Sequence, residues 1–227
     1  MFGRSASIRR FDVRATLRRT AYFVPLLWLA GVVSGLAVLE VYKARPGISG
    51  RTPTVLPQFD AGAEWSDRGR PVLLMFVHPH CPCTQASLGE LAEILAREPG
   101  KSHAVIVFVN PPGAEADWSQ TALRKKAATI PNLRLVDDDG TLARQFGAET
   151  SGHVVLYDTD GKLVFSGGIT RSRGHEGESP GRRAICARLE GTASDAPAET
   201  PVFGCPLFTS GACAGTQCSA DRTGKLP

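Results

Sequence analysis

The stretch Pro71-Val-Leu-Leu-Met-Phe-Val-His-Pro-His-Cys-Pro-Cys-Thr84 decides the fold of this 227-residue chain. Its first half, Pro71 to Val77, is a continuous apolar run, which predicts a buried strand. Thr84 to Arg97 carries leucines at helical spacing, which predicts an amphipathic helix. Cys81 and Cys83 are therefore expected at a strand-to-helix turn, near the positive end of a helix dipole. A thiol there loses its proton readily, and the thiolate is the reactive and metal-binding form.

The Cys-Pro-Cys segment is the first candidate for a functional site. The competing interpretation is a pair of buried structural cysteines. The preceding His78-Pro79-His80 disfavours that interpretation, because such residues are mostly excluded from a protein core.

Strand-like and helix-like segments alternate through the rest of the chain. Further strands are predicted at 103–109, 133–136, 153–157 and 162–166, and further helices at 114–129, 141–146 and 180–190. The last two strands flank Thr159-Asp160-Gly161, a favourable turn for an antiparallel hairpin. Strands that alternate with helices favour parallel pairing, so the closing hairpin makes the predicted sheet mixed. We therefore expect an α/β domain over residues 71–191.

The segments on either side of this domain differ from it in composition. Residues 43–70 contain repeated Pro and Gly and predict a tether, with a short strand near Thr54–Phe59. Residues 192–227 are rich in Ala, Ser, Thr, Gly and Pro, and predict an irregular tail that carries cysteines.

The N-terminal region predicts a membrane anchor. Ala21 to Leu39 holds no charge and would span about 28 Å as a helix, close to the hydrocarbon thickness of a bilayer. We assign residues 1–20 to a basic cytoplasmic segment and residues 21–42 to the anchor. Positive residues stay on the cytoplasmic side, so the C-terminal part is expected outside the inner membrane, in the periplasm of a Gram-negative cell. The competing interpretation, a cleaved signal peptide, is disfavoured because the run is long and ends without small residues.

The charge of the chain excludes a nucleic-acid surface. The formal net charge is +4, but six arginines and one aspartate give the first twenty residues +5. The rest of the chain therefore sums to −1, and the basic character belongs to the membrane signal. Six cysteines in an exported protein are compatible with disulfides.

The order of elements, with cysteines after the first core strand, resembles the thioredoxin superfamily. The segments that carry the resemblance are 72–95 and 139–158, within a match of about residues 71–190. The closest resemblance is to membrane-tethered proteins of the TlpA and ResA type and to peroxiredoxin-like relatives. The loop 166–175 and the tail 202–207 also resemble proteins labelled RedB. The resemblance implies a three-layer fold and thiol–disulfide exchange, with a role in the maturation of cytochromes or copper sites.

The resemblance assigns Cys81 to the exposed nucleophile of the family. Thr84 then falls on the family's second cysteine, and Cys83 lies between the two positions. His80 stands where an aromatic residue usually precedes the nucleophile. Each departure weakens a plain thioredoxin interpretation.

Two more family positions are altered. Met75 stands where a buried acidic residue often lies, which removes a proton acceptor. Gly152 stands where a cis-proline faces the nucleophile, and it leaves backbone free to approach a ligand closely. His153 follows it and borders the expected site, so His80, Thr84, Gly152 and His153 form the predicted substrate side.

In the resembled fold the loop before the last helix also lies near the nucleophile, which makes Arg171, Arg173 and His175 candidates for binding an anionic partner or supporting the thiolate.

The first functional hypothesis is a thiol–disulfide oxidoreductase that acts on protein or small-molecule thiols and disulfides and needs no cofactor. Cys81 attacks, and a second thiol resolves the mixed disulfide. Cys83 is the nearest partner, but residues two apart on a helix face nearly opposite sides, and a bridge between them would be strained. Cys205 is the distant candidate, in a tail long enough to fold back. Cys213 and Cys218 have the spacing to pair with each other, and Cys186 is most simply a small core residue.

Two alternatives come from other functional classes. His78, His80, Cys81 and Cys83 supply imidazole and sulfur within six residues, a combination that suits copper or zinc. A metal-delivery protein resembling the Sco type would need a further ligand such as His153 or His175. The second alternative is a non-catalytic binding module of thioredoxin-like fold, which the residues at 75 and 152 favour and the intact Cys-Pro-Cys opposes.

Overall fold

The computed structural model describes residues 13–59, 69–111, 114–115, 117–118, 120–192 and 196–208, with only the helical backbone for 13–20. The chain divides into two units, Met1–Tyr42 and Lys43–Pro227. The described residues of the first unit belong to helix α1 (Val13–Ala44), which ends just inside the second unit. Within this helix, the 24-residue stretch Ala21–Ala44 has exposed apolar side chains, and an 18-residue window of it has a mean hydropathy of 2.0. Such a helix is long and apolar enough to cross a membrane.

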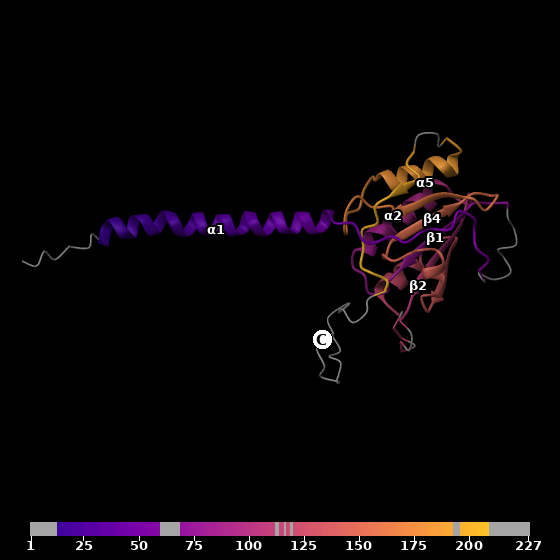
Figure 1. The fold of residues 1–227 in the computed structure, drawn as a ribbon, viewed down its shortest axis with the longest axis horizontal. Helices are drawn as coiled ribbons and strands as arrows, with labels where there is room; N and C mark the ends of the chain where they lie inside the picture. The colour runs from indigo at the N-terminus through magenta and orange to yellow at the C-terminus, as the bar shows by residue number, and fades with distance from the viewer. Residues whose placement is uncertain are drawn as a thin grey trace, which may run out of the picture. The chain divides into compact units, whose positions relative to one another are not determined.

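The second unit is built on a six-stranded mixed sheet (Figure 1). The strands are β1 (Val72–Val77), β2 (His103–Val109), β3 (Leu133–Asp138), β4 (His153–Tyr157), β5 (Leu163–Gly168) and β6 (Glu199–Thr200). Their order across the sheet is β3-β2-β1-β4-β5-β6. The pairs β1–β2, β2–β3 and β5–β6 are parallel, whereas β4 runs antiparallel to both β1 and β5. The predicted mixed sheet and hairpin are confirmed.

Helices cover both faces of the sheet, because alternate residues of β1 point to opposite sides. Leu73, Met75 and Val77 belong to one apolar cluster, which they share with α2 (Thr84–Arg97), α3 (Ala122–Ala127) and α5 (Pro180–Glu190). The intervening residues of β1 belong to a second cluster with α4 (Thr141–Gln145). The three-layer α/β arrangement is therefore present.

Two predicted elements are shorter in the structure. The helix expected over 114–129 is limited to α3, because the hydroxyl of Thr121 accepts a hydrogen bond from Arg124 N at 3.3 Å and caps the helix. The strand expected near Thr54–Phe59 is reduced to a single antiparallel bridge between Val55 and Lys162.

The segment predicted as a tether packs along the sheet over its described part, residues 43–59. Gly50 N donates to Gly147 O at 2.9 Å, and Tyr157 Oη donates to Pro53 O at 2.9 Å. Gly147 has φ +67°, and a Cβ there would lie 2.5 Å from the Arg51 carbonyl oxygen. The close approach thus requires glycine, and the compact unit extends beyond the predicted boundary at residue 71.

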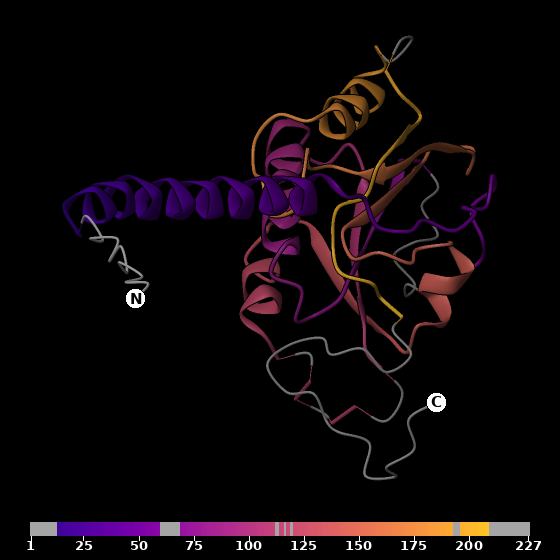
Figure 2. The same cartoon turned by 60° about the vertical axis from the view of Figure 1, so that its left-hand side comes forward.

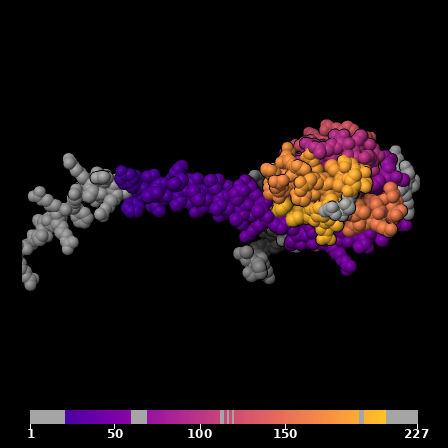
Figure 3. Space-filling view, turned by 90° about the horizontal axis from the view of Figure 1, so that it is seen from above, coloured from indigo at the N-terminus to yellow at the C-terminus, as the bar shows by residue number. Residues whose placement is uncertain are grey.

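The described part of the C-terminal tail is also packed on the sheet. β6 pairs with β5, and the following segment Val202–Leu207, hereafter the strap, runs along the loop before β4. Figures 2 and 3 show this yellow segment on the surface of the compact unit, beside orange segments. Val202 and Leu207 are buried, which anchors the strap at both ends. The other predicted tail cysteines, Cys213 and Cys218, lie outside the described residues.

Candidate active site

Cys81 lies in the turn between β1 and α2, as the sequence predicts. Cys81 N donates to His78 O at 3.0 Å, and Thr84 N donates to Cys81 O at 3.3 Å. Cys83 occupies the N-cap position of α2. The side chain of Cys81 is only 2% exposed, so the candidate nucleophile is covered by its neighbours.

The strap brings Cys205 against Cys81 from 124 residues away. Cys205 N donates to Cys81 Sγ at 3.3 Å, and the Cys205 thiol forms a second hydrogen bond with the same sulfur. Ser151 N donates to Cys205 O at 2.8 Å, which fixes the strap beside the nucleophile. A Cβ at Gly204 would lie 1.9 Å from the Ser151 carbonyl oxygen, so only glycine permits this approach.

These contacts make Cys81 the acidic member of a thiol pair. The hydrogen bond from the Cys205 thiol, opposed by burial and helped by Thr84, lowers the pKa of Cys81 from 9.0 to about 5. The pKa of Cys205 is raised, first because its thiol donates to Cys81 and then because it is buried. The reduced pair therefore shares one proton near neutral pH, and that proton resides on Cys205.

Cys83 lies at the same site but in a different environment. Burial, followed by the charge of Cys81, raises its pKa, and Arg173 opposes both effects. Its thiol is hydrogen-bonded to Arg173 and to Cys81. Cys81, Cys83, Cys186 and Cys205, the described cysteines, are all unbridged. Cys186 packs at the edge of the first apolar cluster, away from this group.

Thr84 takes part in a buried hydroxyl network. Thr84 Oγ1 lies 2.7 Å from Ser151 Oγ, and His78 N donates to Ser151 Oγ at 2.8 Å. Thr84 also hydrogen-bonds Cys81, so the network links the nucleophile to the loop before β4. The sequence argument did not identify Ser151; its place directly before Gly152 is the only signal that pointed to it.

His80 and Gly152 border the turn through backbone contacts. The ring centroids of His80 and Trp118 are 4.4 Å apart, and His80 Nε2 donates to Trp118 O at 3.0 Å. Gly152 has φ +90°, and its N donates to Phe76 O at 2.8 Å, which joins the loop to the end of β1. Trp118 is a further neighbour that no sequence pattern indicated.

His153 lies in the core and not on the predicted substrate side. It is fully buried, and its Nε2 lies 2.9 Å from Ser166 Oγ on β5. Burial lowers its pKa to about 4, so the ring is neutral at physiological pH. The alternation of side chains along β4 explains this orientation, because His153 shares a face with the buried Val155 and Tyr157.

The predicted metal ligands do not converge in the described part of the chain. There, no group of three or more His, Cys, Asp or Glu side chains is arranged to hold a metal ion. Of the alternative set His78, His80, Cys81 and Cys83, His80 is turned toward Trp118. The geometry therefore lends no support to a metal site at these four residues.

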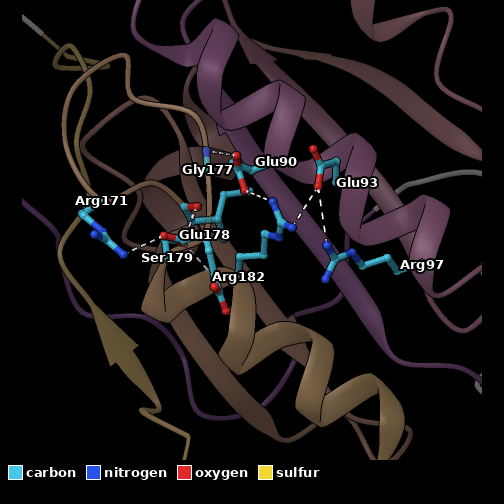
Figure 4. Close-up of polar contacts among 9 residues, drawn as sticks. Glu90, Glu93, Arg97, Arg171, Gly177, Glu178, Ser179 and Arg182 are labelled. Carbon is cyan, nitrogen blue, oxygen red and sulfur yellow. Dashed lines mark hydrogen bonds and ion pairs between the residues drawn. The ribbon is translucent and has the colours of Figure 1, made fainter.

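Arg173 belongs to the loop between β5 and α5. A buried ion pair between Arg182 and Glu90 holds the end of this loop against α2 (Figure 4). Glu90, 2% exposed, accepts from Gly177 N at 2.6 Å and from Arg182 Nη1 at 2.7 Å. Arg182 Nη2 also pairs with Glu93 at 2.9 Å. From the same loop, Arg173 donates to Gly204 O in the strap.

Comparison with known proteins relates the chain to others through its fold. No protein-family model and no curated protein sequence matches it. A hypothetical protein of Sinorhizobium meliloti superposes with a TM-score of 0.54 and 22% identity, over 74% of this chain and 99% of that one. An uncharacterised conserved protein of Geobacillus kaustophilus gives 0.52 and 20%, over 75% and 95%. A secreted disulfide oxidoreductase of Mycobacterium tuberculosis gives 0.40 and 18%, over 63% and 95%.

Proposed function

The chain has a thioredoxin-like fold, and on that premise we propose that it is an exported, membrane-anchored thiol–disulfide oxidoreductase whose working pair is Cys81 and Cys205. The observation that carries the proposal is the contact of Cys205 N with Cys81 Sγ at 3.3 Å, beside the thiol–thiol hydrogen bond. A thiolate next to a second thiol is the arrangement that disulfide exchange requires. The substrates are thiols and disulfides of proteins or small molecules.

In the first step, the Cys81 thiolate attacks one sulfur of a substrate disulfide. The substrate S–S bond breaks, a bond forms between Cys81 and that sulfur, and the other substrate sulfur leaves as a thiolate that takes up a proton. The lowered pKa of Cys81 ensures that the attacking thiolate is present at neutral pH.

In the second step, Cys205 loses its proton and attacks the Cys81 sulfur. The mixed disulfide breaks, the second substrate thiolate leaves, and a Cys81–Cys205 disulfide remains. Two electrons have then passed from the enzyme to the substrate, and of the two protons that the substrate thiols take up, one comes from Cys205 and the other from solvent. The reverse sequence oxidises a substrate dithiol, and contacts that stabilise the Cys81 thiolate contribute to this direction by stabilising the reduced enzyme.

Cys205 is a better resolving residue than Cys83 on geometric grounds. Cys83 lies at the N-cap of α2 with φ −65° and ψ −28°, only two residues from Cys81. A bridge between them would close a very small, strained ring. The strap presents Cys205 from a separate segment, so the Cys81–Cys205 disulfide closes a long loop.

Trapping experiments on the full chain test this proposal. The expected result is that Cys205→Ser accumulates a mixed disulfide with a substrate, Cys81→Ser accumulates none, and Cys83→Ser resolves normally. Mass mapping of the oxidised protein is expected to find Cys81 linked to Cys205. A Cys81–Cys83 bridge would contradict the assignment of the pair.

The same samples decide between the proposal and its alternatives. If the protein binds stoichiometric copper or zinc and Cys81→Ala loses this metal, metal delivery would replace thiol exchange as the proposed function. Absence of any exchange in the reduced, correctly folded protein would leave a binding module. Exchange without bound metal supports the oxidoreductase.

A further inference from the structure

We propose that Arg173 is a positioning residue for Cys205, which aims its peptide group at Cys81 and keeps a positive charge beside its sulfur during the second step of exchange. The inference rests on the proposed Cys81–Cys205 chemistry and deepens it. Arg173 is not expected to touch the substrate.

Arg173 and Cys81 bind opposite ends of one peptide group. The carbonyl of Gly204 and the N–H of Cys205 belong to the same planar unit. Arg173 Nη1 donates to that carbonyl, and the N–H donates to Cys81 Sγ at 3.3 Å. A hydrogen bond to the carbonyl from a charged donor also polarises the amide, which strengthens the N–H as a donor.

Arg173 also brings a positive charge to Cys205. The charged and titratable groups that act on Cys205 are Cys81, Cys83 and Arg173. Cys81 disfavours ionisation of Cys205 while it is itself a thiolate. Once Cys81 is bound in a mixed disulfide, its negative charge is gone. Arg173 is then the charge that favours the Cys205 thiolate, which is the species that must attack.

The loop that carries Arg173 is held in place before any substrate arrives. Arg173 N donates to Lys43 O at 3.2 Å. Further along the loop, Gly177 N donates to the buried Glu90 at 2.6 Å. A side chain on a loop fixed at both points loses little freedom when it supports the reaction.

The test separates the two steps in the full chain in detergent, with hydroxyethyl disulfide as a small uncharged probe. All variants carry Cys83→Ser, so that only Cys205 resolves. The first step is the rate of mixed-disulfide formation in the added Cys205→Ser background. The second step is the rate of release of the second probe thiol when Cys205 is present.

Arg173→Leu is expected to slow the second step about tenfold, the effect of one pKa unit on the thiolate fraction. The first step is expected to change by no more than about twofold, because the Cys205 N–H that Arg173 orients is only one of the donors that stabilise the Cys81 thiolate. The second-step pH profile of Arg173→Leu is expected to move to higher pH. Arg173→Lys keeps a charge and is expected to recover part of the rate. The matched control is Arg171→Leu in the same loop, because Arg171 contacts the Glu178 carbonyl and not the strap.

The outcomes also separate this inference from the proposed function. If Cys205→Ser traps the mixed disulfide but Arg173→Leu leaves the second step and its pH profile unchanged, the role of Arg173 is wrong and the pair stands. If Cys205→Ser traps nothing, the pair itself is wrong. An equal loss in both steps, also seen in Arg171→Leu, would mean a merely structural effect of the loop.

Discussion

At the scale of single residues, Cys81 is activated by the same contacts that bury it. The Cys205 thiol and Thr84 donate to its sulfur, while burial alone would oppose ionisation. Hydrogen bonds to the charged form therefore outweigh desolvation at this position. A buried thiolate of this kind is protected from small oxidants in solution. The strap must move before a large substrate reaches it.

Thr84→Val is expected to raise the pKa of Cys81, because the substitution removes a hydrogen-bond donor to the thiolate while nearly conserving volume. The ultraviolet absorbance of the thiolate, followed against pH, measures the change. Thr84→Ser keeps the hydroxyl and is expected to titrate like the natural protein. An unchanged titration in Thr84→Val would show that Cys205 alone lowers the pKa.

The depressed pKa of Cys81 also predicts a pH-dependent stability. A group with a folded pKa of about 5 against an unfolded value of 9.0 contributes its full stabilisation above 9.0 and loses it as the pH falls toward 5. The buried His78 and His153, with lowered pKa values, add a similar trend only below their unfolded value of 6.5. The raised pKa values of Cys83, Cys186 and Cys205 act in the opposite sense as the pH approaches their unfolded value of 9.0. The window between about pH 7 and pH 8 therefore reports Cys81.

In that window, the free energy of unfolding of the reduced unit from Lys43 onward is expected to rise with pH, by at most about 1.4 kcal/mol per pH unit. Denaturant unfolding under reducing conditions measures it. Cys81→Ser is expected to lose the slope. A slope that persists in this variant would assign the effect to another group.

At the scale of elements, the strap is the feature that local sequence patterns do not indicate. The boundaries of α2 and β2 agree with their apolar periodicity, because such periodicity reflects burial against the nearest layer. The partner of Cys81 depends instead on a contact across 124 residues. The sequence left Cys83 and Cys205 as alternatives, since the burial of Val202 and Leu207 and the hydrogen bonds of the strap to other loops determine where the strap lies.

The same limit explains His153 and Arg173. His153 follows Gly152 in the sequence, but it is the first residue of β4, and only the packing of the sheet decides which way its side chain points. Arg173 was one of three charged candidates in its loop. Contacts from separate elements, Lys43 and the strap, distinguish it from Arg171.

Gly204→Ala is expected to detach the strap, because its Cβ would meet the Ser151 carbonyl oxygen at 1.9 Å. Alkylation of Cys81 by a bulky reagent should accelerate, while formation of the Cys81–Cys205 disulfide under mild oxidation should slow. Pro201→Ala, at an exposed position just before the strap, is the control and should behave like the natural protein. Unchanged alkylation in Gly204→Ala would mean that the strap does not cover Cys81 in solution.

The ion pair beneath the loop gives a second prediction at this scale. Glu90→Gln is expected to lower the free energy of unfolding by about 3–5 kcal/mol, because it leaves the buried Arg182 guanidinium without its principal counter-charge. Glu93→Gln removes the other carboxylate that pairs with Arg182. Because the Glu93 side chain is 57% exposed, this loss should lower the free energy of unfolding by no more than about 1 kcal/mol. Denaturant midpoints compare the two. Equal losses would show that burial does not determine the strength of this pair.

At the scale of the whole molecule, the apolar helix and the cysteine site support one interpretation. Ala21–Ala44 is long enough for a bilayer, and its large apolar side chains are exposed. Disulfide chemistry persists in oxidising compartments and is rare in the cytosol. A helix that holds the redox unit outside the cytoplasmic membrane would place the Cys81–Cys205 pair where its chemistry is sustained.

The flanking charge of that helix predicts its orientation. The first twenty residues carry six arginines, and such a segment remains on the cytoplasmic side. An alkaline phosphatase reporter fused after Pro227 is therefore expected to be active, since it folds only outside the cytoplasm, and a green fluorescent reporter at the same point is expected to be dark. Replacing the six arginines by glutamate should reduce the difference between the two reporters, and this variant serves as the matched control. Cytoplasmic reporter activity in the natural sequence would reject the orientation, and a C-terminal unit released from the membrane fraction would identify the helix as a cleaved signal.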